Sequence, residues 1–428
     1  MADYGVRVSL FYAALFLIYG VHLPYLPLWL EWRGLTPAEI GIVTSAPFFL
    51  RLVVTPSVAY LADRHANHAQ TILWLSWIGL GAALVLAALH GFWPILVGAT
   101  VMTLATYTVM PLTETVAIGG VRRGLDYGRM RLWDSLTFVA ASFAGGAAVD
   151  WAGRGAGLWL IIIGCVATVA AAYVLPQADA AFDRRRRNAA RAATSALEPP
   201  LAPVPPRRGI DRGTVLRLTR HPLFLVFLLA IGTVQAAHAT FYTFGAIHWR
   251  ANGLSSAWIG TLWAIGVMTE VTLFAMSGAA VRRFGPILLL LVGAAAAVVR
   301  WAAMSLDPSL GWLVALQILH GATYGASHLG AIHFIARAIP EAAGGTAQAL
   351  YATIASGVFQ GAATLLSGVL YASYGGGAYL AMAIVAALGL AATLVLGRHW
   401  DGGLLWSDAG DRAQPDAADG AATASPPK

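Results

Sequence analysis

The chain contains few charged residues for its length. Asp, Glu, Lys and Arg make up 11% of its 428 residues, whereas a soluble domain typically contains about 25%. Hydrophobic residues make up 58%. This composition excludes an ordinary soluble protein and indicates a chain that is embedded in a lipid bilayer.

The residue types that many enzymes and metal sites require are also scarce. Cys165 is the single cysteine, so it has no disulfide partner, and we expect an inert small side chain there. The sequence contains no HExxH, GxSxG or CxxC motif and no phosphate-binding glycine loop. His65 and His68 are close in sequence, but no third metal ligand is evident. We therefore expect no enzyme activity, no bound metal and no cofactor.

Apolar runs of about 20 residues, the length that crosses a bilayer as a helix, occur twelve times. They cover residues 8–30, 38–62, 71–89, 93–117, 127–150, 156–175, 222–245, 256–280, 284–303, 309–336, 345–371 and 376–397. The predicted fold class is an all-α integral membrane protein with twelve transmembrane helices.

Two copies of one pattern divide these runs into similar halves. The first copy contains Gly41 and the second contains Gly260, 219 residues later. The same separation of 219 residues relates Arg51 to Glu270, and each is a lone charge near the middle of an apolar run. A duplicated bundle with ionisable groups near its midplane is the architecture of a secondary transporter.

The composition changes between the halves and after them. Residues 176–221 contain four consecutive arginines followed by a proline-rich stretch. Such a segment cannot bury enough apolar surface to fold alone, although a short interfacial helix is expected at 214–222. The predicted organisation is a six-helix half (1–175), a basic, Pro-rich cytoplasmic linker (176–221), a second six-helix half (222–398) and a disordered cytoplasmic tail (399–428).

The formal net charge of +7 raises the question of a polyanionic partner. Nearly all arginines lie in alternate loops, together with the termini and the linker, while the opposite loops contain only Arg33, Arg154 and Arg250. This asymmetry follows the positive-inside rule. It predicts a multi-pass protein of the inner (plasma) membrane with both termini in the cytoplasm, and nucleic acid is not needed to explain the charge.

The loop after the second run, Ala59–Arg64 (AYLADR), resembles the cytoplasmic loop motif of the major facilitator superfamily. The resemblance implies that an acid and an arginine at helix ends latch the two halves in one state. The match is incomplete, because Arg282 stands where the second copy would have the acid. Charged helix ends without a latch are the alternative. The residues expected to act in gating are Arg51, Asp63, Arg64, Arg129, Arg282 and Arg283.

A narrower resemblance is carried by Leu125–Trp133 (LDYGRMRLW), Ala236–Tyr242 (AAHATFY) and Leu319–His328 (LHGATYGASH). These stretches resemble the phenylpropionate permease branch, a relative of the lactose-permease group of proton symporters. The resemblance extends from about residue 8 to 397, apart from the linker, and implies proton-coupled uptake of an aromatic acid. Asp134 departs from the pattern, because relatives usually have a small residue there.

Glu114 and Arg131 are expected to form an ion pair, because they lie near the same end of two consecutive runs. A charge at mid-membrane costs at least about 2.5 to 3.5 kcal/mol on insertion scales, so pairing is favoured. In the lactose-permease group a glutamate and an arginine at similar spacing bind substrate, and the resemblance implies that role here. The alternative is a structural pair that fixes two helices.

A polar stripe occurs in the tenth run. Its members His320, Tyr324, Ser327 and His328 follow the spacing i, i+4, i+7 and i+8, which predicts one helix face toward the bundle interior. We expect His320 and His328 to bind substrate there. The alternative is that each histidine bonds a backbone carbonyl in the helix packing.

Arg300 precedes His320 by 20 residues, a spacing also found in the lactose-permease group, which implies substrate-binding and proton-coupling roles for both. That group has a proton-carrying carboxylate one turn after the histidine, whereas this chain has Thr323. Glu270 is therefore the expected proton carrier. Burial favours its neutral carboxyl and a nearby arginine favours its carboxylate, so alternating contact with Arg300 or Arg51 would load and release a proton. A histidine is the alternative carrier.

Aromatic side chains one turn apart occur on two runs: His238 with Tyr242, and Tyr25 with Trp29. In the major facilitator fold these runs line the central cavity, so Tyr25, His238 and Tyr242 are expected to hold a planar ring. Two prolines flank Tyr25 and distort its helix, which favours a cavity position. For Trp29 an interfacial aromatic belt is the alternative.

The predicted function is proton-coupled symport of a small organic solute by alternating access. Arg131 and Arg300 suit a carboxylate, and the resemblance indicates an aromatic one. The same groups suit the hydroxyls of a sugar or nucleoside. The sequence is also compatible with a proton-coupled efflux antiporter and with a transport-dead sensor or scaffold. The expected partners are the small-molecule substrate, protons and the lipid bilayer, and the expected state is a monomer.

Overall fold

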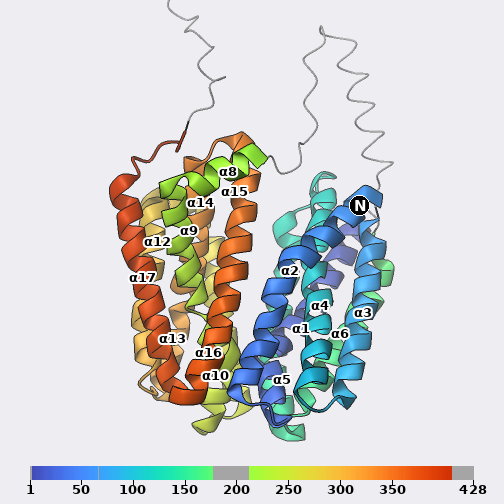
Figure 1. The fold of residues 1–428 in the computed structure, drawn as a ribbon. Helices are drawn as coiled ribbons and strands as arrows, with labels where there is room; N and C mark the ends of the chain where they lie inside the picture. The colour runs from blue at the N-terminus through green and yellow to red at the C-terminus, as the bar shows by residue number, and fades with distance from the viewer. Residues whose placement is uncertain (1, 66, 177–211, 407–428) are drawn as a thin grey trace, which may run out of the picture.

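The computed structural model describes residues 2–65, 67–176 and 212–406, and these ranges form two helical bundles that stand side by side (Figure 1). The N-terminal half contains α1 (Ala2–Trp32), α2 (Pro37–His65), α3 (His68–Ala88), α4 (Phe92–Val121), α5 (Tyr127–Ala152) and α6 (Ala156–Val174).

The C-terminal half is preceded by a short basic helix, α8 (Arg212–Arg220), so a helix is found within two residues of the predicted bounds at each end. The half itself contains α9 (Pro222–Ala236), α10 (Ala239–Ala251), α11 (Ser256–Ala275), α12 (Ser277–Met304), α13 (Leu310–Ile318), η1 (Gly321–Ala326), α14 (Ser327–Ala338), α15 (Glu341–Thr353), η2 (Ile354–Phe359), α16 (Gln360–Tyr374), η3 (Gly375–Gly377) and α17 (Ala378–His399).

The twelve predicted spans are all helical in the described ranges. Among the described residues, ten helices are individually long and apolar enough to cross a membrane. One of the ten, Glu341–His399, is 59 residues long and turns at η3, so it supplies two spans. The twelfth span is α13–η1–α14, whose pieces are too short to count singly because the wider π-helical turn of η1 interrupts it.

The junction between the eighth and ninth spans differs from the sequence expectation. The eighth helix ends at Ala275 rather than near residue 280, and residues 277–284 form the start of α12. Gly285 then adopts a φ of 68°, which L-residues with a side chain rarely adopt, and Pro286 follows with no N–H to donate. These two residues kink α12 where the sequence predicts the next span to begin.

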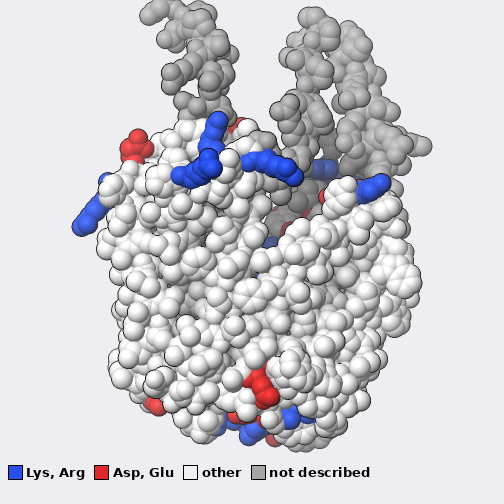
Figure 2. Space-filling view, in the orientation of Figure 1, with Lys and Arg blue, Asp and Glu red and all other residues white. Residues whose placement is uncertain are grey.

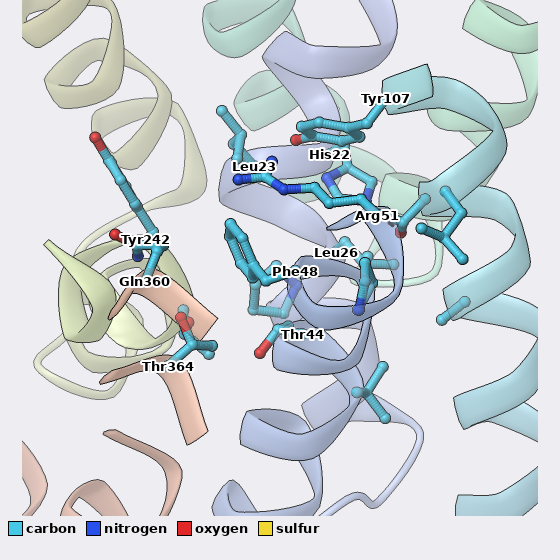
Figure 3. Close-up of a pocket in the computed structure, with 17 residues that line it drawn as sticks. His22, Leu23, Leu26, Thr44, Phe48, Arg51, Tyr107, Tyr242, Gln360 and Thr364 are labelled. Carbon is cyan, nitrogen blue, oxygen red and sulfur yellow. Dashed lines mark hydrogen bonds between the residues drawn. The ribbon is translucent and has the colours of Figure 1, made fainter. Parts of the chain in front are cut away.

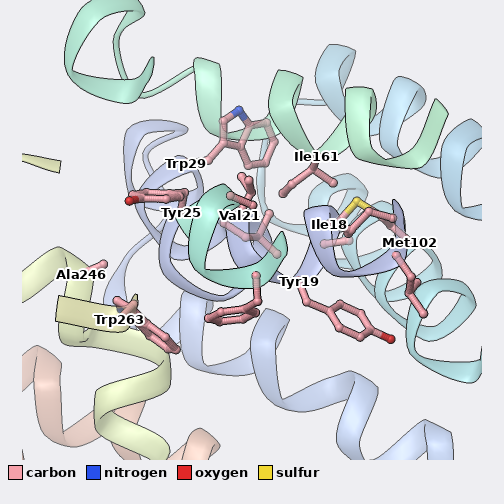
Figure 4. Close-up of a cluster of buried hydrophobic side chains, with 14 of the residues drawn as sticks. Ile18, Tyr19, Val21, Tyr25, Trp29, Met102, Ile161, Ala246 and Trp263 are labelled. Atoms are coloured by element: carbon pink, nitrogen blue, oxygen red, sulfur yellow. The ribbon is translucent and has the colours of Figure 1, made fainter. Parts of the chain in front are cut away.

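Apolar side chains fill the interior of each half, and one cluster continues from the first half into the second (Figure 4). Trp29 is 1% exposed and lies near Val21 and Ile161 within the N-terminal half. The interfacial belt suggested for this residue is therefore wrong, because its ring is in the packed core. Tyr25 and Trp263 belong to the same cluster, which connects the two halves.

The beginning of the C-terminal tail is ordered, contrary to the prediction for residues 399–428. The Leu405 amide donates to the Ala338 carbonyl at 2.7 Å, and Trp400 and Trp406 pack against the apolar cluster at the start of α9 and the end of α14. Apolar side chains between 400 and 406 explain this packing. The rest of the predicted tail, and residues 177–211 of the predicted linker, lie outside the described residues.

Candidate functional site

A cavity of about 450 Å³ lies between the two halves. We call the molecular face that carries α8 the linker face. Figure 2 shows a hollow between the bundles toward this face, with charged side chains inside it. The ionisable or strongly polar residues in the cavity wall are Arg51, Arg131 and Asp134 from the first half, and Gln235, Glu270, Gln317, His320 and Gln360 from the second.

The opposite face is closed by direct contact between the halves, with α5 packed along α11 and α2 packed along α16. The Tyr25 hydroxyl donates to the Ser142 carbonyl at 2.7 Å and lies 3.2 Å from the Ser256 carbonyl of the other half. Tyr25 is completely buried there and does not line the cavity. The predicted contact of Tyr25 with a substrate ring is therefore absent from this conformation.

Asp150 also joins the halves at the closed face. Its Oδ1 atom accepts from the Ser256 amide at 2.8 Å and its Oδ2 atom accepts from the Ala257 amide at 2.9 Å, at the first turn of α11. Arg250 adds an ion pair at 3.0 Å. A carboxylate at a helix N-terminus satisfies amides that have no partner within the helix. Asp150 therefore fastens the first half to the start of α11.

The predicted ion pair between Glu114 and Arg131 is confirmed, with 3.0 Å between Arg131 Nη1 and Glu114 Oε1. Arg131 also contacts Asp134, at 2.8 Å from Nε to Oδ2. Tyr127 completes the cluster, because its hydroxyl donates to Glu114 Oε2 at 2.5 Å and accepts from Arg131. One guanidinium therefore faces two carboxylates, which gives the cluster an excess of acceptors.

Arg300 and His320 meet as the spacing indicates, with 3.0 Å between Arg300 Nη1 and His320 Nδ1. A guanidinium has no acceptor, so His320 Nδ1 must accept and neutral His320 carries its hydrogen on Nε2. That nitrogen lies 3.6 Å from Glu270 Oε2. Glu270 thus contacts His320 rather than the predicted Arg300 or Arg51.

Arg300 is held behind the cavity wall. Its side chain is 0% exposed and also donates to Thr323 at 3.2 Å and to Gln317 at 2.8 Å. His238 is equally buried, and its Nε2 lies 3.1 Å from the Thr323 hydroxyl. In this conformation Arg300 and His238 support the wall, and Tyr242 is the member of the predicted aromatic pair that reaches the cavity.

The polar stripe of the tenth span splits into two directions, because residues 321–326 form a π-helix instead of an α-helix. His320, Tyr324 and His328 stack in sequence, with ring centroids 5.8 and 6.1 Å apart. Ser327 instead lies against Gly293 of α12. His328 does not line the cavity and contacts the Tyr351 hydroxyl at 2.9 Å. The prediction of one face for all four residues was wrong.

The predicted gating residues near the linker face do not form an ion pair between the halves within the described ranges. Asp63 contacts His68 of its own half at 2.8 Å. Arg129 lies 3.9 Å from Asp126, also in its own half. Among the predicted gating residues, Arg51 is the one in the cavity wall, where it donates to the Ser356 carbonyl of the other half.

Several wall residues were not singled out in the sequence. Gln235 donates to the Tyr351 hydroxyl at 2.6 Å and accepts from the Ser356 hydroxyl at 2.8 Å. Gln317 accepts from Arg300. An amide side chain inside an apolar run carries a desolvation cost, and this signal could have identified both glutamines. Tyr107 gives no comparable signal, because aromatic residues are common in membrane helices.

The fold and the cavity are those of a membrane transporter: two six-helix halves enclose a polar cavity that is open at one face and sealed at the other. In the described residues, no three His, Cys, Asp or Glu side chains gather as a metal site would require.

The chain belongs to the MFS_1 like family, whose model matches residues 6–381. It is 31% identical over 391 residues to a probable 3-phenylpropionic acid transporter of Escherichia coli (strain K12), with 89% of this chain and 94% of the relative covered. It is 28% identical over 402 residues to a maltose permease of Geobacillus stearothermophilus, with 91% and 94% covered. The crystal structure of nucleoside transporter NupG has a similar fold, with a TM-score of 0.76 at 15% identity, and 92% of this chain and 99% of that chain are covered.

Proposed function

We propose that the protein is a proton-coupled symporter that takes up a small aromatic carboxylate by alternating access, and that this structure is its inward-open state. The positive-inside distribution of arginines supports a cytoplasmic linker face, in the inner membrane of the cell. The cavity opens toward that face, so substrate and proton would leave through it.

The placement of Glu270 carries the coupling proposal. Its carboxyl lines the cavity, where water and substrate reach it, and its one charged or ionisable contact within ion-pair distance in the described ranges is His320. Binding a proton removes a costly charge from the middle of the membrane. Neutral His320 directs its Nε2 hydrogen toward Glu270 and is itself fixed by Arg300. We propose that Glu270 carries the proton and that His320 and Arg300 adjust its affinity.

The relative named as a probable 3-phenylpropionic acid transporter supports the substrate class. The cavity wall is also rich in aromatic rings, including Phe48, Tyr107, Phe241, Tyr242 and Trp263. Aromatic faces and edges pack favourably against a planar ring. An aromatic ligand therefore fits this wall better than a fully hydroxylated one.

A sugar or nucleoside is the second candidate substrate. The cluster of Glu114, Arg131 and Asp134 favours it, because spare carboxylate acceptors suit hydroxyl donors. The maltose permease relative agrees with this second candidate.

Gating by the charged residues at the linker face is part of the proposal. We propose that Asp63, Arg64, Arg129, Arg282 and Arg283 close this face in the outward-open state, since no ion pair holds them together across the halves in the described part of this conformation. The protein is proposed to act as a monomer.

Uptake into proteoliposomes tests the substrate class. Purified protein would be given radiolabelled 3-phenylpropionate, maltose or a nucleoside with an inward proton gradient, and protein-free liposomes would correct for diffusion. We expect saturable uptake of 3-phenylpropionate that an excess of the other two does not inhibit. Saturable uptake of maltose or the nucleoside instead would replace the aromatic carboxylate with the second candidate.

A further inference from the structure

The arginines at the cavity differ in how well their charge is neutralised. Arg131 faces Glu114 and Asp134. Arg51 has no carboxylate within ion-pair distance among the described residues. Its contacts include the Ser356 carbonyl and the face of the Phe48 ring, 4.7 Å from the guanidinium carbon. A cation at mid-membrane without a counter-ion is costly, so this position favours an anionic ligand.

Arg51 is also accessible to a ligand. It lines the central cavity and a smaller compartment of about 100 Å³ that lies beside it. The two spaces share the wall residues Leu23, Phe48, Arg51, Tyr107, Tyr242 and Gln360. In Figure 3 the Arg51 side chain extends between Tyr107 and Phe48, with its guanidinium on the side of the C-terminal half. The guanidinium therefore lies where the two spaces join.

The smaller compartment suits the apolar part of a ligand. Most of the surface that lines it is apolar and includes Leu26, Pro27, Val43, Pro47 and Leu104, while His22 and four threonines also border it. An apolar cavity of roughly 150 Å³ holds benzene in another protein, and this compartment is of similar order and shares part of its wall with the larger space. A ring there would contact Phe48 and Tyr107 while its side chain reached the guanidinium.

The present partner of Arg51 is replaceable. Ser356 lies in the π-helix η2, and its carbonyl takes the hydrogen bond from Arg51 across the interface between the halves. A neutral carbonyl binds a guanidinium more weakly than a carboxylate does, because a carboxylate accepts two parallel charge-assisted bonds. A substrate carboxylate would displace the carbonyl and release this link between the halves.

We propose that Arg51 binds the carboxylate of the substrate, with the aromatic ring in the smaller compartment, whose wall includes Phe48 and Tyr107. This assignment rests on the proposed function and makes Arg51 the residue that selects an acid over a neutral analogue. Arg131, already faced by two carboxylates, is not the anion site.

The test compares the binding of 3-phenylpropionate and of its neutral amide, 3-phenylpropionamide, to purified protein by calorimetry. The wild type is expected to prefer the acid. Arg51→Gln should weaken acid binding by about 10- to 100-fold, the value of lost charge-assisted hydrogen bonds, and change amide binding by less than about threefold. Arg51→Lys keeps the charge and loses the bidentate geometry, so its affinity for the acid should lie between those of the wild type and Arg51→Gln.

Arg154→Gln is the matched control. Arg154 forms a 3.0 Å ion pair with Glu31, away from the cavity, and its loss should leave both affinities unchanged. If Arg51→Gln binds the acid as the wild type does, or if acid and amide weaken equally in both folded Arg51 variants, the assignment is wrong. If the wild type itself fails to bind the acid, the proposed substrate class fails and the carboxylate site with it.

Discussion

Gly41 of α2 lies against Gly368 of α16, so closely that a Cβ atom on Gly41 would be 2.8 Å from the Cα atom of Gly368. Gly260, its counterpart 219 residues later, meets α5 in the same manner, and a Cβ atom there would be 2.0 Å from the Ser142 carbonyl oxygen. The sequence repeat thus marks two places where the halves touch at the closed face.

Replacing Gly260 by alanine is expected to open the closed face. The added methyl group has no space beside the Ser142 carbonyl, so the contact between α5 and α11 must separate. The measurement is labelling of a single cysteine placed at Phe138 in the cavity, in a Cys165→Ser background, by an impermeant reagent added at the face opposite the linker. The labelling rate should rise at least about tenfold, and transport should fall. Gly81→Ala is the control, because nothing lies within 4 Å of its added Cβ atom. Equal rates for both variants would contradict the account.

Replacing Asp150 by asparagine should loosen the same seal to a smaller extent. The ion pair with Arg250 is lost, and one amide NH₂ replaces an oxygen that accepts from the start of α11. The closed face should lose about 1 to 2 kcal/mol of stabilisation. We therefore expect the population that is open at this face to rise five- to thirtyfold, measured as the labelling rate of the same cysteine. Glu31→Gln removes an ion pair of equal length that lies within the first half. It should leave the labelling rate unchanged, and a similar rise in both variants would exclude a specific role for Asp150.

Replacing Arg300 by leucine should destabilise the protein. The substitution leaves His320, Thr323 and Gln317 without their shared donor in a buried site. The expected loss is roughly 3 kcal/mol, visible as a fall of several degrees in the melting temperature of the purified protein. The exposed Arg398 at the end of α17 provides the control, and Arg398→Leu should melt like the wild type. An unchanged melting temperature for Arg300→Leu would contradict a structural role.

The sequence predicts contacts that depend on neighbouring spans and cannot predict those that depend on the exact helical register. Two expected contacts are found: the pair of Glu114 and Arg131, and the pair of Arg300 and His320. Each pair lies on consecutive helices, which bring residues at the same depth together. The predicted direction of Ser327 was wrong because residues 321–326 form a π-helix, which has a different angular spacing from an α-helix. Nothing in the sequence reveals this π-helix.

Contacts between distant spans were also beyond prediction. Tyr25 closes the opposite face because residues 142 and 256 of two different halves converge on its hydroxyl. Arg51 could be recognised in the sequence as a lone mid-membrane charge, but its position at the junction of two spaces required the structure.

The most direct measurement is the external pH of weakly buffered proteoliposomes when 3-phenylpropionate is added outside, with protein-free liposomes as the baseline for diffusion of the acid. The account predicts alkalinisation above that baseline with the wild type. With Glu270→Gln it predicts none, while exchange of labelled substrate across the membrane continues. Saturable substrate entry without alkalinisation in the wild type, or full alkalinisation in Glu270→Gln, would contradict proton symport through Glu270.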